Sequence, residues 1–376
     1  MNKVKIKDFG VEMWMNTYEN DCKYNLAETC VEPLTVNELL EMSGKKEEVL
    51  DEIINMQLTY GDIEGSKSLR TAVAGLFKNI KTENIVITHG GISANALSIM
   101  TLVEPGDRVI SVLPTYQQHY SIPESIGADV KILKLKAENN FLPDLDELKS
   151  YVNENTKLIC INNPNNPTGA VMDEDFLKKI VDIAKSCGAY LLCDEVYRGL
   201  VHEGDNFSVS VADIYDKGIS TGSVSKTFSL AGLRVGWIVG PEEFVARVNK
   251  QRDYHVISVG MINDKLATIA LENKEKILKR NLKIVRENVG ILDKWVSKEP
   301  KITYIKPQGG TTAFLKYDAK ISSAEFCIRL QKEKGVMLLP GSALEVEGYI
   351  RIGYCNTTEI LRRGLELTSE FLKELK

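Results

Sequence analysis

The chain has 376 residues, of which 43% are hydrophobic and 26% charged, and its formal net charge at pH 7 is −5. This composition is typical of a soluble globular protein, and a mildly acidic balance without a Lys/Arg block argues against a nucleic-acid partner. No segment approaches the roughly 18 consecutive apolar residues of a membrane-spanning helix, and residues 1–10 lack the apolar stretch of a secretory signal. We therefore expect a cytoplasmic protein with no nucleic-acid or membrane partner.

Neither the seven cysteines nor the four histidines are spaced as metal ligands. The cysteine count is odd and no Cys-x-x-Cys pair occurs, which argues against a disulfide framework and against a zinc site. Cys160 and Cys193 lie inside apolar runs, where cysteine usually behaves as a small buried hydrophobe. The sequence therefore predicts no bound metal.

The middle of the chain alternates short β-branched runs with amphipathic helical stretches. Strands that are apolar throughout and separated by helices are typical of a mostly parallel sheet that is covered on both faces. One intervening helix has clear ends, since Asp173 can cap its start and Gly188 follows its apolar stripe. Seven strands are expected in this region, at residues 84–88, 108–112, 130–133, 157–161, 190–194, 218–221 and 235–239.

The segments on either side of this region have a different pattern. A long helix, continuous or interrupted, is expected from about Asn263 toward Asp293, and the first 45 residues carry few strand signals. Because the chain exceeds the usual size of one domain, we expect a large domain at residues 46–280 and a small α+β domain formed by residues 1–45 and 281–376. The small domain is expected to contain strands at 302–305, 312–315, 336–339 and 349–352.

Five polar segments follow the ends of predicted strands. Each has an ordinary explanation on its own, such as a tight turn, a helix cap or a core aromatic residue, but ligand-binding residues of open α/β sheets gather at strand ends. A glycine pair between a strand and a helix can bind an anion, and a buried carboxylate such as Asp194 is unfavourable without a positive partner. The segments are Thr88-His-Gly-Gly-Ile92, Leu113-Pro-Thr-Tyr116, Asn162-Asn-Pro-Asn-Asn-Pro-Thr-Gly169, Cys193-Asp-Glu-Val-Tyr197 and Ser223-Val-Ser-Lys-Thr-Phe-Ser-Leu-Ala-Gly-Leu-Arg234.

In this order the segments resemble the class I/II aminotransferases of the aspartate aminotransferase superfamily. The resemblance covers nearly the whole chain, from about Tyr60 to Arg351. It implies the α/β architecture of PLP fold type I, with a large domain whose mostly parallel seven-stranded sheet is sandwiched by helices, and a smaller α+β domain. It also implies pyridoxal 5'-phosphate (PLP) as the cofactor.

The resemblance implies three catalytic residues and two further contacts at the cofactor ring. Lys226 would form a Schiff base with PLP and act as the general base at the substrate Cα, a role that needs a lowered pKa. Asp194 would pair with the pyridine nitrogen and keep the ring an electron sink. Tyr197, also catalytic, and Asn166 would hydrogen-bond the phenolic oxygen, and Tyr116 would stack on the ring. Asn166 would also contact the substrate, and a cis peptide bond is expected after it.

The phosphate of PLP would lie where a helix begins after the glycine pair, because backbone N–H groups and the helix dipole favour an anion there. Arginine suits this position since its planar fork matches phosphate oxygens. In relatives the tyrosine at the position of Tyr60 reaches the phosphate in the partner subunit's site, which implies a homodimer with shared active sites. The remaining phosphate contacts that the resemblance implies come from Gly90, Gly91, Ile92, Ser223, Ser225 and Arg234.

Arg351 aligns with the arginine that binds the substrate α-carboxylate in the family, a task that suits a bidentate guanidinium. The N-terminal substrate segment departs from the family's usual Gly-x-Pro, because residues 25–33 read Asn-Leu-Ala-Glu-Thr-Cys-Val-Glu-Pro. Glu28 is a candidate for pairing with a basic substrate side chain, and the segment is similar to capreomycidine-synthase-like relatives, which cyclise a hydroxyarginine. Glu28 and Glu32 are equally well explained as solvated loop carboxylates.

Three functions are compatible with these residues. The leading expectation is an aminotransferase that moves an amino group between an L-amino acid and a 2-oxo acid. A PLP-dependent elimination, replacement or cyclisation enzyme would use the same residues, because they act at the Cα and do not decide where the electrons go next. A PLP-sensing regulator is a distant alternative, since such chains carry a basic helix-turn-helix domain and the residues before Tyr60 show no basic recognition helix.

Overall fold

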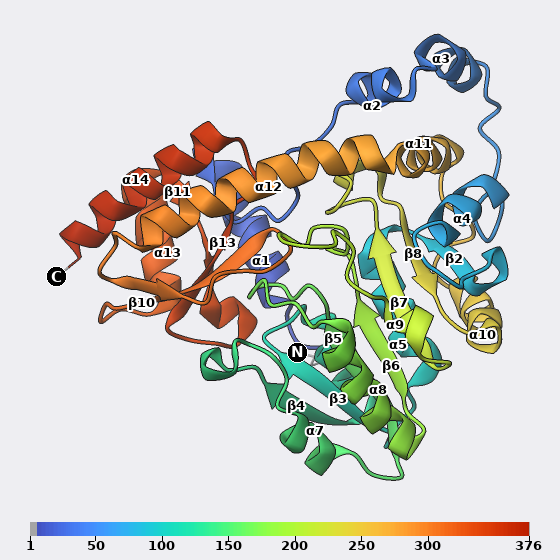
Figure 1. The fold of residues 1–376 in the computed structure, drawn as a ribbon, viewed down its shortest axis with the longest axis horizontal. Helices are drawn as coiled ribbons and strands as arrows, with labels where there is room; N and C mark the ends of the chain where they lie inside the picture. The colour runs from blue at the N-terminus through green and yellow to red at the C-terminus, as the bar shows by residue number, and fades with distance from the viewer. Residues whose placement is uncertain (1–5, 376) are drawn as a thin grey trace, which may run out of the picture.

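The computed structural model describes residues 6–375, and a seven-stranded sheet forms the centre of its larger part (Figure 1). The strand order is β2-β8-β7-β6-β5-β3-β4. β8 is antiparallel to both of its neighbours, and the other strands run in one direction. The seven predicted strands and the mostly parallel sheet are confirmed. The bounds are β2 Ile85–Thr88, β3 Arg108–Leu113, β4 Asp129–Lys134, β5 Thr156–Asn162, β6 Tyr190–Asp194, β7 Gly218–Ser223 and β8 Gly236–Val239.

Helices cover both faces of this sheet. Alternate residues of each strand point to opposite faces, so apolar side chains on both faces need to be buried. In β5, Leu158 and Cys160 belong to a core shared with α5 and α10, whereas Ile159 and Ile161 belong to a core shared with α8. This packing explains why the strands are apolar throughout. The helices around the sheet are α4 Lys67–Ala74, α5 Gly90–Leu102, α6 Gln118–Ile126, α7 Leu145–Tyr151, α8 Glu174–Cys187, α9 Val211–Ile214 and α10 Glu242–Arg252.

The helix ends follow from residues that are visible in the sequence. The Asp173 side chain accepts the N–H of Phe176 at 2.8 Å, and Gly188 ends α8 with a φ of 69°. The long helix predicted toward residue 293 is interrupted once, at Asn273. Both predictions are confirmed. The two parts of the long helix are α11 Met261–Glu272 and α12 Lys274–Val296.

A second sheet of four strands lies at the far end of α12, in the order β12-β13-β10-β9. The strand predicted at 336–339 is divided, because Val336 and Met337 pair with the N-terminal segment and Leu339 pairs with Arg351. The N-terminal segment packs here through α1 and β1, as the sequence predicts. The bounds are α1 Gly10–Tyr18, β1 Tyr24–Asn25, β9 Ile302–Tyr304, β10 Thr312–Tyr317, α13 Ser323–Lys334, β11 Val336–Met337, β12 Leu339–Pro340, β13 Tyr349–Gly353 and α14 Thr358–Glu374.

Two short helices, α2 Val36–Ser43 and α3 Lys46–Ile54, form an arm that projects from the body in Figure 1. α2 packs against α11, beside the larger sheet. Residues 1–45 therefore have neighbours in both parts of the molecule, and the domain boundaries at 45/46 and 280/281 stay a prediction. Within residues 6–375 no helix is both long and apolar enough to cross a membrane. The cytoplasmic location also stays a prediction.

The parallel strands end at one edge of the seven-stranded sheet. The last residues of β5, β6 and β7 are Asn162, Asp194 and Ser223, and all three line one cavity. Strand ends of this kind are where open α/β sheets bind their ligands.

Candidate active site

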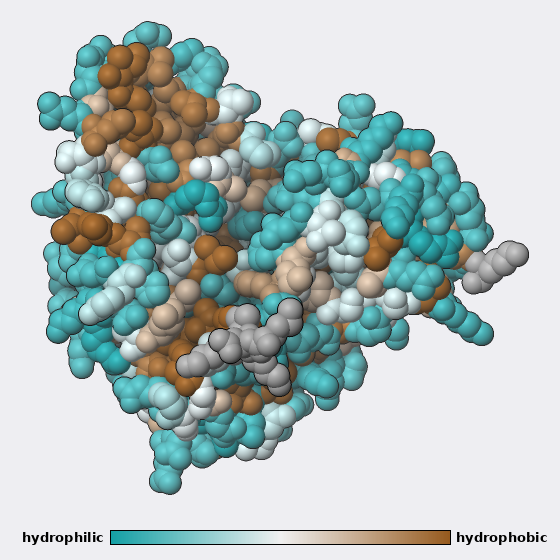
Figure 2. Space-filling model, turned by 180° about the vertical axis from the view of Figure 1, so that it is seen from behind, coloured by the Kyte–Doolittle hydropathy of each residue, from teal (hydrophilic) through white to brown (hydrophobic). Residues whose placement is uncertain are grey.

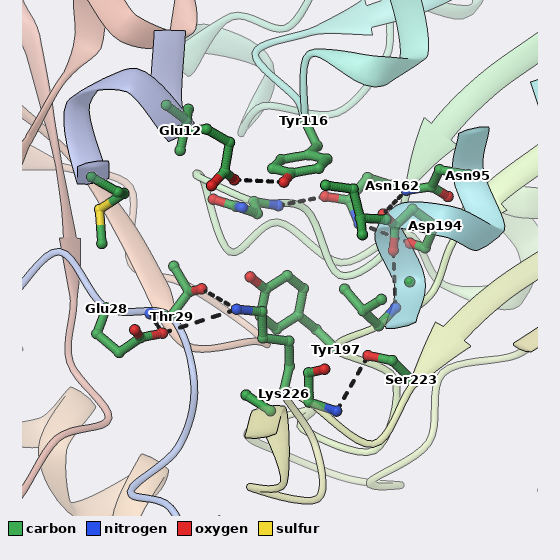
Figure 3. A pocket seen from close by; sticks show the side chains of 18 of the residues that line it. Glu12, Glu28, Thr29, Asn95, Tyr116, Asn162, Asp194, Tyr197, Ser223 and Lys226 are labelled. Atoms are coloured by element: carbon green, nitrogen blue, oxygen red, sulfur yellow. Dashed lines mark hydrogen bonds and ion pairs between the residues drawn. The ribbon is translucent and has the colours of Figure 1, made fainter. Parts of the chain in front are cut away.

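A cavity of about 300 Å³ lies between the strand ends of the larger sheet, β13 and the N-terminal segment (Figure 3). Gly90 lies immediately beside it, but Tyr60 is 74% exposed and does not line the cavity of its own chain. The cavity brings together the other predicted site residues, which are Glu28, Gly91, Ile92, Tyr116, Asn166, Asp194, Tyr197, Ser223, Ser225, Lys226, Arg234 and Arg351.

Lys226 reaches into the cavity from the loop after β7. Its Nζ donates to Thr29 Oγ1 at 2.7 Å and lies 3.4 Å from Cys30 Sγ and 4.0 Å from Glu28 Oε1. Burial lowers the pKa of Lys226, but Cys30, Tyr197 and Glu28 outweigh it, so the pKa lies above its ordinary value. This direction differs from the lowered pKa that a general base needs, because Cys30, Tyr197 and Glu28 all favour the ammonium form.

Asp194 lies at the end of β6 and is only 5% exposed. Its Oδ2 accepts Asn95 Nδ2 at 2.8 Å, and its Oδ1 accepts the N–H of Val196 at 3.1 Å. Asn95 is fixed in turn, since its Oδ1 accepts the hydroxyl of Thr221 at 2.6 Å. Among the described residues no ion pair involves Asp194. A buried carboxylate that is held only by neutral donors is suited to a cationic partner in the cavity.

Two tyrosines and an asparagine surround the middle of the cavity. The hydroxyl of Tyr116 donates to Glu12 Oε1 at 2.6 Å, and burial raises the pKa of both Tyr116 and Tyr197. The N–H of Asn166 donates to Asn162 Oδ1 at 2.7 Å, which fixes this turn. The peptide bond after Asn166 is cis, as predicted, and the bonds before Pro114 and Pro164 are cis as well.

The end of the cavity next to α5 is rich in hydrogen-bond donors. Gly90 begins α5 with a φ of 76°, and a Cβ there would lie 2.7 Å from Nη2 of Arg234. The hydroxyl of Ser223 accepts the N–H of Ser225 at 3.3 Å. Backbone N–H groups at a helix start, two hydroxyls and a guanidinium together suit a phosphate.

Arg351 lies in β13 and is 3% exposed. Its Nη2 donates to the carbonyl of Ala27 at 2.8 Å and its Nη1 to Asn166 Oδ1 at 3.3 Å. Its Nε is buried without a hydrogen-bond partner within the described part of the chain. Burial lowers the pKa of Arg351, although Tyr197 and Glu28 act in the opposite direction. Because an unpaired buried donor is unfavourable, this guanidinium is suited to bind a carboxylate.

Comparison with known proteins places the chain in a family. Residues 31–366 match the family Aminotransferase class I and II. The chain belongs to this family. This class I/II aminotransferase is 30% identical to capreomycidine synthase of Streptomyces vinaceus over 96% of this chain and 93% of the relative. It is also 30% identical to aspartate aminotransferase of Thermotoga maritima over 84% of each chain.

Solved structures agree with the family. A PLP-dependent aminotransferase from Streptococcus suis 89-1591 superposes with a TM-score of 0.96, at 42% identity and with 99% of both chains covered. The PLP-dependent cyclase OrfR superposes with a TM-score of 0.91, at 25% identity over 100% of this chain and 99% of that chain. The class I/II aminotransferase described here is therefore a PLP-dependent transferase of fold type I.

The residues of the cavity fit PLP. The donor-rich end next to α5 matches the phosphate, and the buried carboxylate of Asp194 matches the pyridine nitrogen. Lys226 places an amine in the same cavity, where it could form a covalent bond with PLP. No group of three or more His, Cys, Asp or Glu residues suited to a metal occurs within residues 6–375, and the seven cysteines are free.

Glu28 lies in a loop and lines the cavity, and its side chain is 37% exposed. Its Oε1 accepts the N–H groups of Thr29 at 2.6 Å and Cys30 at 2.8 Å. Burial raises the pKa of Glu28, but Lys226 and these N–H groups outweigh it, so the pKa lies below its ordinary value. Glu32, the second candidate, does not line the cavity. A contact between Glu28 and a substrate stays a prediction.

Four polar cavity residues of the N-terminal segment and α5 were not predicted, namely Glu12, Glu19, Thr29 and Asn95. Asn95 is the partner of Asp194, and its signal was a polar residue in a mostly apolar helix. Thr29 accepts a hydrogen bond from Lys226, but nothing in the sequence marks it as a site residue, since threonine is common in loops. Glu12 and Glu19 lie on the N-terminal segment, and their helical spacing was visible, but nothing in the sequence said what that helix face covers.

Proposed function

We propose that this class I/II aminotransferase moves an amino group from an L-amino acid to a 2-oxo acid, with Lys226 carrying the Cα proton. One observation supports the proposal most. A single cavity holds a lysine amine, a buried arginine with an unused donor and a buried carboxylate without an ion pair, which are Lys226, Arg351 and Asp194.

Arg351 would bind the α-carboxylate of the substrate. Its Nη1 and Nη2 are already held by Asn166 and Ala27, so the guanidinium plane is fixed before the substrate arrives. A fixed donor set avoids reorganisation on binding and holds the Cα in a defined place. Because Lys226 lines the same cavity, a substrate anchored at Arg351 has its Cα in the space that Lys226 reaches.

When PLP is bound, its ring supplies the electron sink for the negative charge that forms at the Cα. Asp194 would keep the ring nitrogen positive, and Asn95 and the N–H of Val196 hold this carboxylate in one orientation. The amine of Lys226 would take the Cα proton and return it, with Thr29 Oγ1 as a hydrogen-bond partner that positions Nζ.

Transfer of nitrogen tests the proposal directly. The purified holoenzyme is incubated with a ¹⁵N-labelled L-amino acid and an unlabelled 2-oxo acid, and both products are analysed by mass spectrometry. We expect the label in the amino acid that forms from the 2-oxo acid, and one 2-oxo acid formed for each label transferred. Label that stays with the donor skeleton, or leaves as ammonia, would contradict amino transfer.

A cyclisation or elimination reaction is the second candidate. The similarity to capreomycidine synthase spans 96% of this chain, and the cyclase OrfR covers all of it. The same residues would remove the Cα proton, and a leaving group on the substrate side chain would then accept the electrons. The labelling experiment separates the two, because cyclisation keeps the donor nitrogen in a single product and forms no 2-oxo acid.

The proposal includes a homodimer with shared active sites. Tyr60 lies on the surface of its own chain, as expected for a residue that acts in the partner's site. Figure 2 shows hydrophobic side chains gathered on the back of the molecule, over the projecting arm of α2 and α3. Large exposed apolar areas are typical of interaction surfaces. The exposed large hydrophobic residues include Val36, Ile54, Leu58, Ile63, Met100, Tyr254 and Ile257.

Subunit exchange tests the shared site. Lys226→Ala and Tyr60→Ala proteins are each expected to be weakly active or inactive, whereas an exchanged mixture should regain activity, because the hybrid contains one site with both residues native. A mixture that stays as inactive as its components, although exchange is shown by native mass spectrometry, would contradict the shared site.

A further inference from the structure

The N-terminal helix forms a wall of the active-site cavity with a distinct chemical pattern. Glu12, Met15 and Glu19 are spaced three and four residues apart along α1 and the 3₁₀ turn Glu19–Asp21 that follows it, so they share one helical face. All three line the cavity, together with Val11. This face therefore combines two carboxylates with an apolar surface.

The carboxylates of this wall have no ion-pair partner within residues 6–375. In the proposed function Lys226, Arg351, Arg234 and Asp194 each have a partner in the cofactor or in the substrate backbone. Glu12 accepts one hydroxyl, from Tyr116, and Glu19 accepts a long hydrogen bond of 3.5 Å from Asn25. Neither forms an ion pair with any described residue. Glu28, a third glutamate of the cavity, lies on the same side as Glu12 in Figure 3 and is paired with Lys226 at 4.0 Å.

The three carboxylates also repel one another. Burial raises the pKa of Glu19, and the negative charges of Glu28 and Glu12 raise it further. Lys226 lies 4.0 Å from Glu28 and acts on Glu19 in the opposite direction, but it does not outweigh the other causes, so the pKa of Glu19 stays raised. A positive ligand group next to Glu12 and Glu19 would relieve the remaining repulsion.

Arg351 supplies an independent observation at another wall. Its guanidinium is 3% exposed and lines the same cavity, and its Nε has no partner within the described residues. An unpaired buried donor of this kind points to an anionic ligand group. The cavity is thus suited to a ligand with a carboxylate at one position and a cation at another, and Val11 and Met15 offer contact for methylene groups between them.

We infer that the substrate is an L-amino acid whose side chain carries a guanidinium or a primary ammonium on an aliphatic stem, and that Glu12 and Glu19 bind this cation. The inference rests on the proposed function, which places the α-carboxylate at Arg351. Aspartate and glutamate are disfavoured, because their side chains would add a negative charge to a wall that already holds two.

The test uses ligands that bind without reacting. Argininic acid (2-hydroxy-5-guanidinopentanoic acid) and 2-hydroxyhexanoic acid both carry the carboxylate, and neither has an amine to transfer. Their affinities for the holoenzyme are measured by isothermal titration calorimetry. We expect argininic acid to bind at least roughly tenfold more tightly, since hydrogen bonds to charged groups are the strong ones. Equal affinities would overturn the inference.

Single substitutions locate the cation. Glu12→Gln is expected to weaken the binding of argininic acid roughly 10- to 100-fold, because Glu12 is partly buried. Glu19→Gln is expected to weaken it only about 3- to 10-fold, because Glu19 is exposed to solvent. Binding of 2-hydroxyhexanoic acid should change less than about twofold in both. Asp21→Asn is the matched control, since Asp21 is exposed on the same 3₁₀ turn but does not line the cavity, and it should change neither affinity.

The combined Glu12→Gln/Glu19→Gln protein decides the matter. If it keeps the native preference for argininic acid while its thermal unfolding and cofactor absorbance are native, the inference is wrong. Failure of the proposed function is a separate outcome. In that case the native protein still binds argininic acid more tightly than 2-hydroxyhexanoic acid, and the double variant does not. However, no ¹⁵N passes from a basic amino acid to any 2-oxo acid.

Discussion

Two sides of the active-site cavity are built in different ways. We call the first side the floor, which consists of the cavity residues Asn95, Asn162, Asp194 and Ser223, together with Thr221, which holds Asn95. Most of these are strand-end residues of the seven-stranded sheet, and all are buried and hydrogen-bonded to one another or to backbone. We call the second side the roof, which consists of Glu12, Met15, Glu19, Glu28 and Thr29 of the N-terminal segment.

The roof is less closed than the floor. Its elements are one short helix, a 3₁₀ turn and a loop, and Glu19 is exposed to solvent. Figure 3 shows Glu28 and Thr29 on the opposite side of the cavity from Asp194 and Asn95, with Lys226 and Tyr197 between them. The floor provides the fixed groups that the cofactor would need, and the roof provides two carboxylates, Glu12 and Glu19, that have no ion-pair partner among the described residues. We expect chemistry to depend on the floor and on Lys226, and substrate choice to depend on the roof.

The largest effect is expected at the residue between the two sides. Lys226→Ala should lower the rate of ¹⁵N transfer roughly 10⁴-fold or more, because both the covalent partner of PLP and the base at the Cα are lost. The control is Lys217→Ala, which removes a lysine outside the cavity and should leave the rate native. A rate within tenfold of native for Lys226→Ala would contradict the catalytic role of Lys226.

A neutral floor tests the role of Asp194. Asp194→Asn keeps the shape but loses the charge, and it should lower the transfer rate roughly 10²- to 10³-fold, as removal of a fixed electrostatic partner does in other enzymes. The affinity for argininic acid should change much less, because Asp194 lies on the side away from Glu12. Loss of rate and affinity in the same proportion would show that floor and roof do not act separately.

Asn95 joins Asp194 of the floor to Thr221 of β7 through two hydrogen bonds. Asn95→Leu would leave Oδ2 of Asp194 and the hydroxyl of Thr221 without their partner, so the free energy of unfolding should fall by about 1–3 kcal/mol. The rate should also fall while the affinity for argininic acid stays native. Ser93→Ala on the same helix is the control for unfolding measured by denaturant. An unchanged stability for Asn95→Leu would mean that the pair does not hold Asp194.

Asp194 and Ser223 of the floor could be predicted from the sequence, whereas Glu28 is the one predicted residue of the roof. Asp194 and Ser223 end neighbouring parallel strands, so the predicted sheet also predicts that their side chains meet at one edge. Glu12 lies more than 200 residues before Lys226, and its helical pattern says only that one face is shared with Glu19. Which surface that face covers depends on the packing of α1 against the C-terminal part of the chain, which no local pattern encodes.

The pKa of Lys226 shows the same limit. A catalytic base in a cavity suggests a lowered pKa, but Cys30, Tyr197 and Glu28 together raise the pKa of Lys226. Cys30 and Glu28 are distant from Lys226 in the sequence, so no local pattern indicates this direction. Glu28 itself was found because its segment departs from the usual Gly-x-Pro of the family, whereas Asn95 and Thr29 had no comparable mark.

The smallest effect is the pH dependence of the roof. The pKa of Glu19 is raised, so Glu19 loses its charge at a higher pH than an ordinary glutamate, and the affinity for argininic acid should decline as the pH falls through that raised pKa. The groups that face Glu19 are Glu12, Glu28, Lys226 and Asn25. Glu19→Gln should remove this part of the pH profile, roughly a threefold to tenfold change in affinity. A profile identical to that of the native protein would assign the dependence to another group.

The covalent position of the cofactor tests the central claim most directly. Purified holoenzyme is reduced with sodium borohydride, which fixes the bond between PLP and its lysine, and the peptides are mapped by tandem mass spectrometry. We expect the added pyridoxyl mass on Lys226 and on no other lysine. An unmodified Lys226 in reduced holoenzyme, or the added mass on a different lysine, would contradict the account.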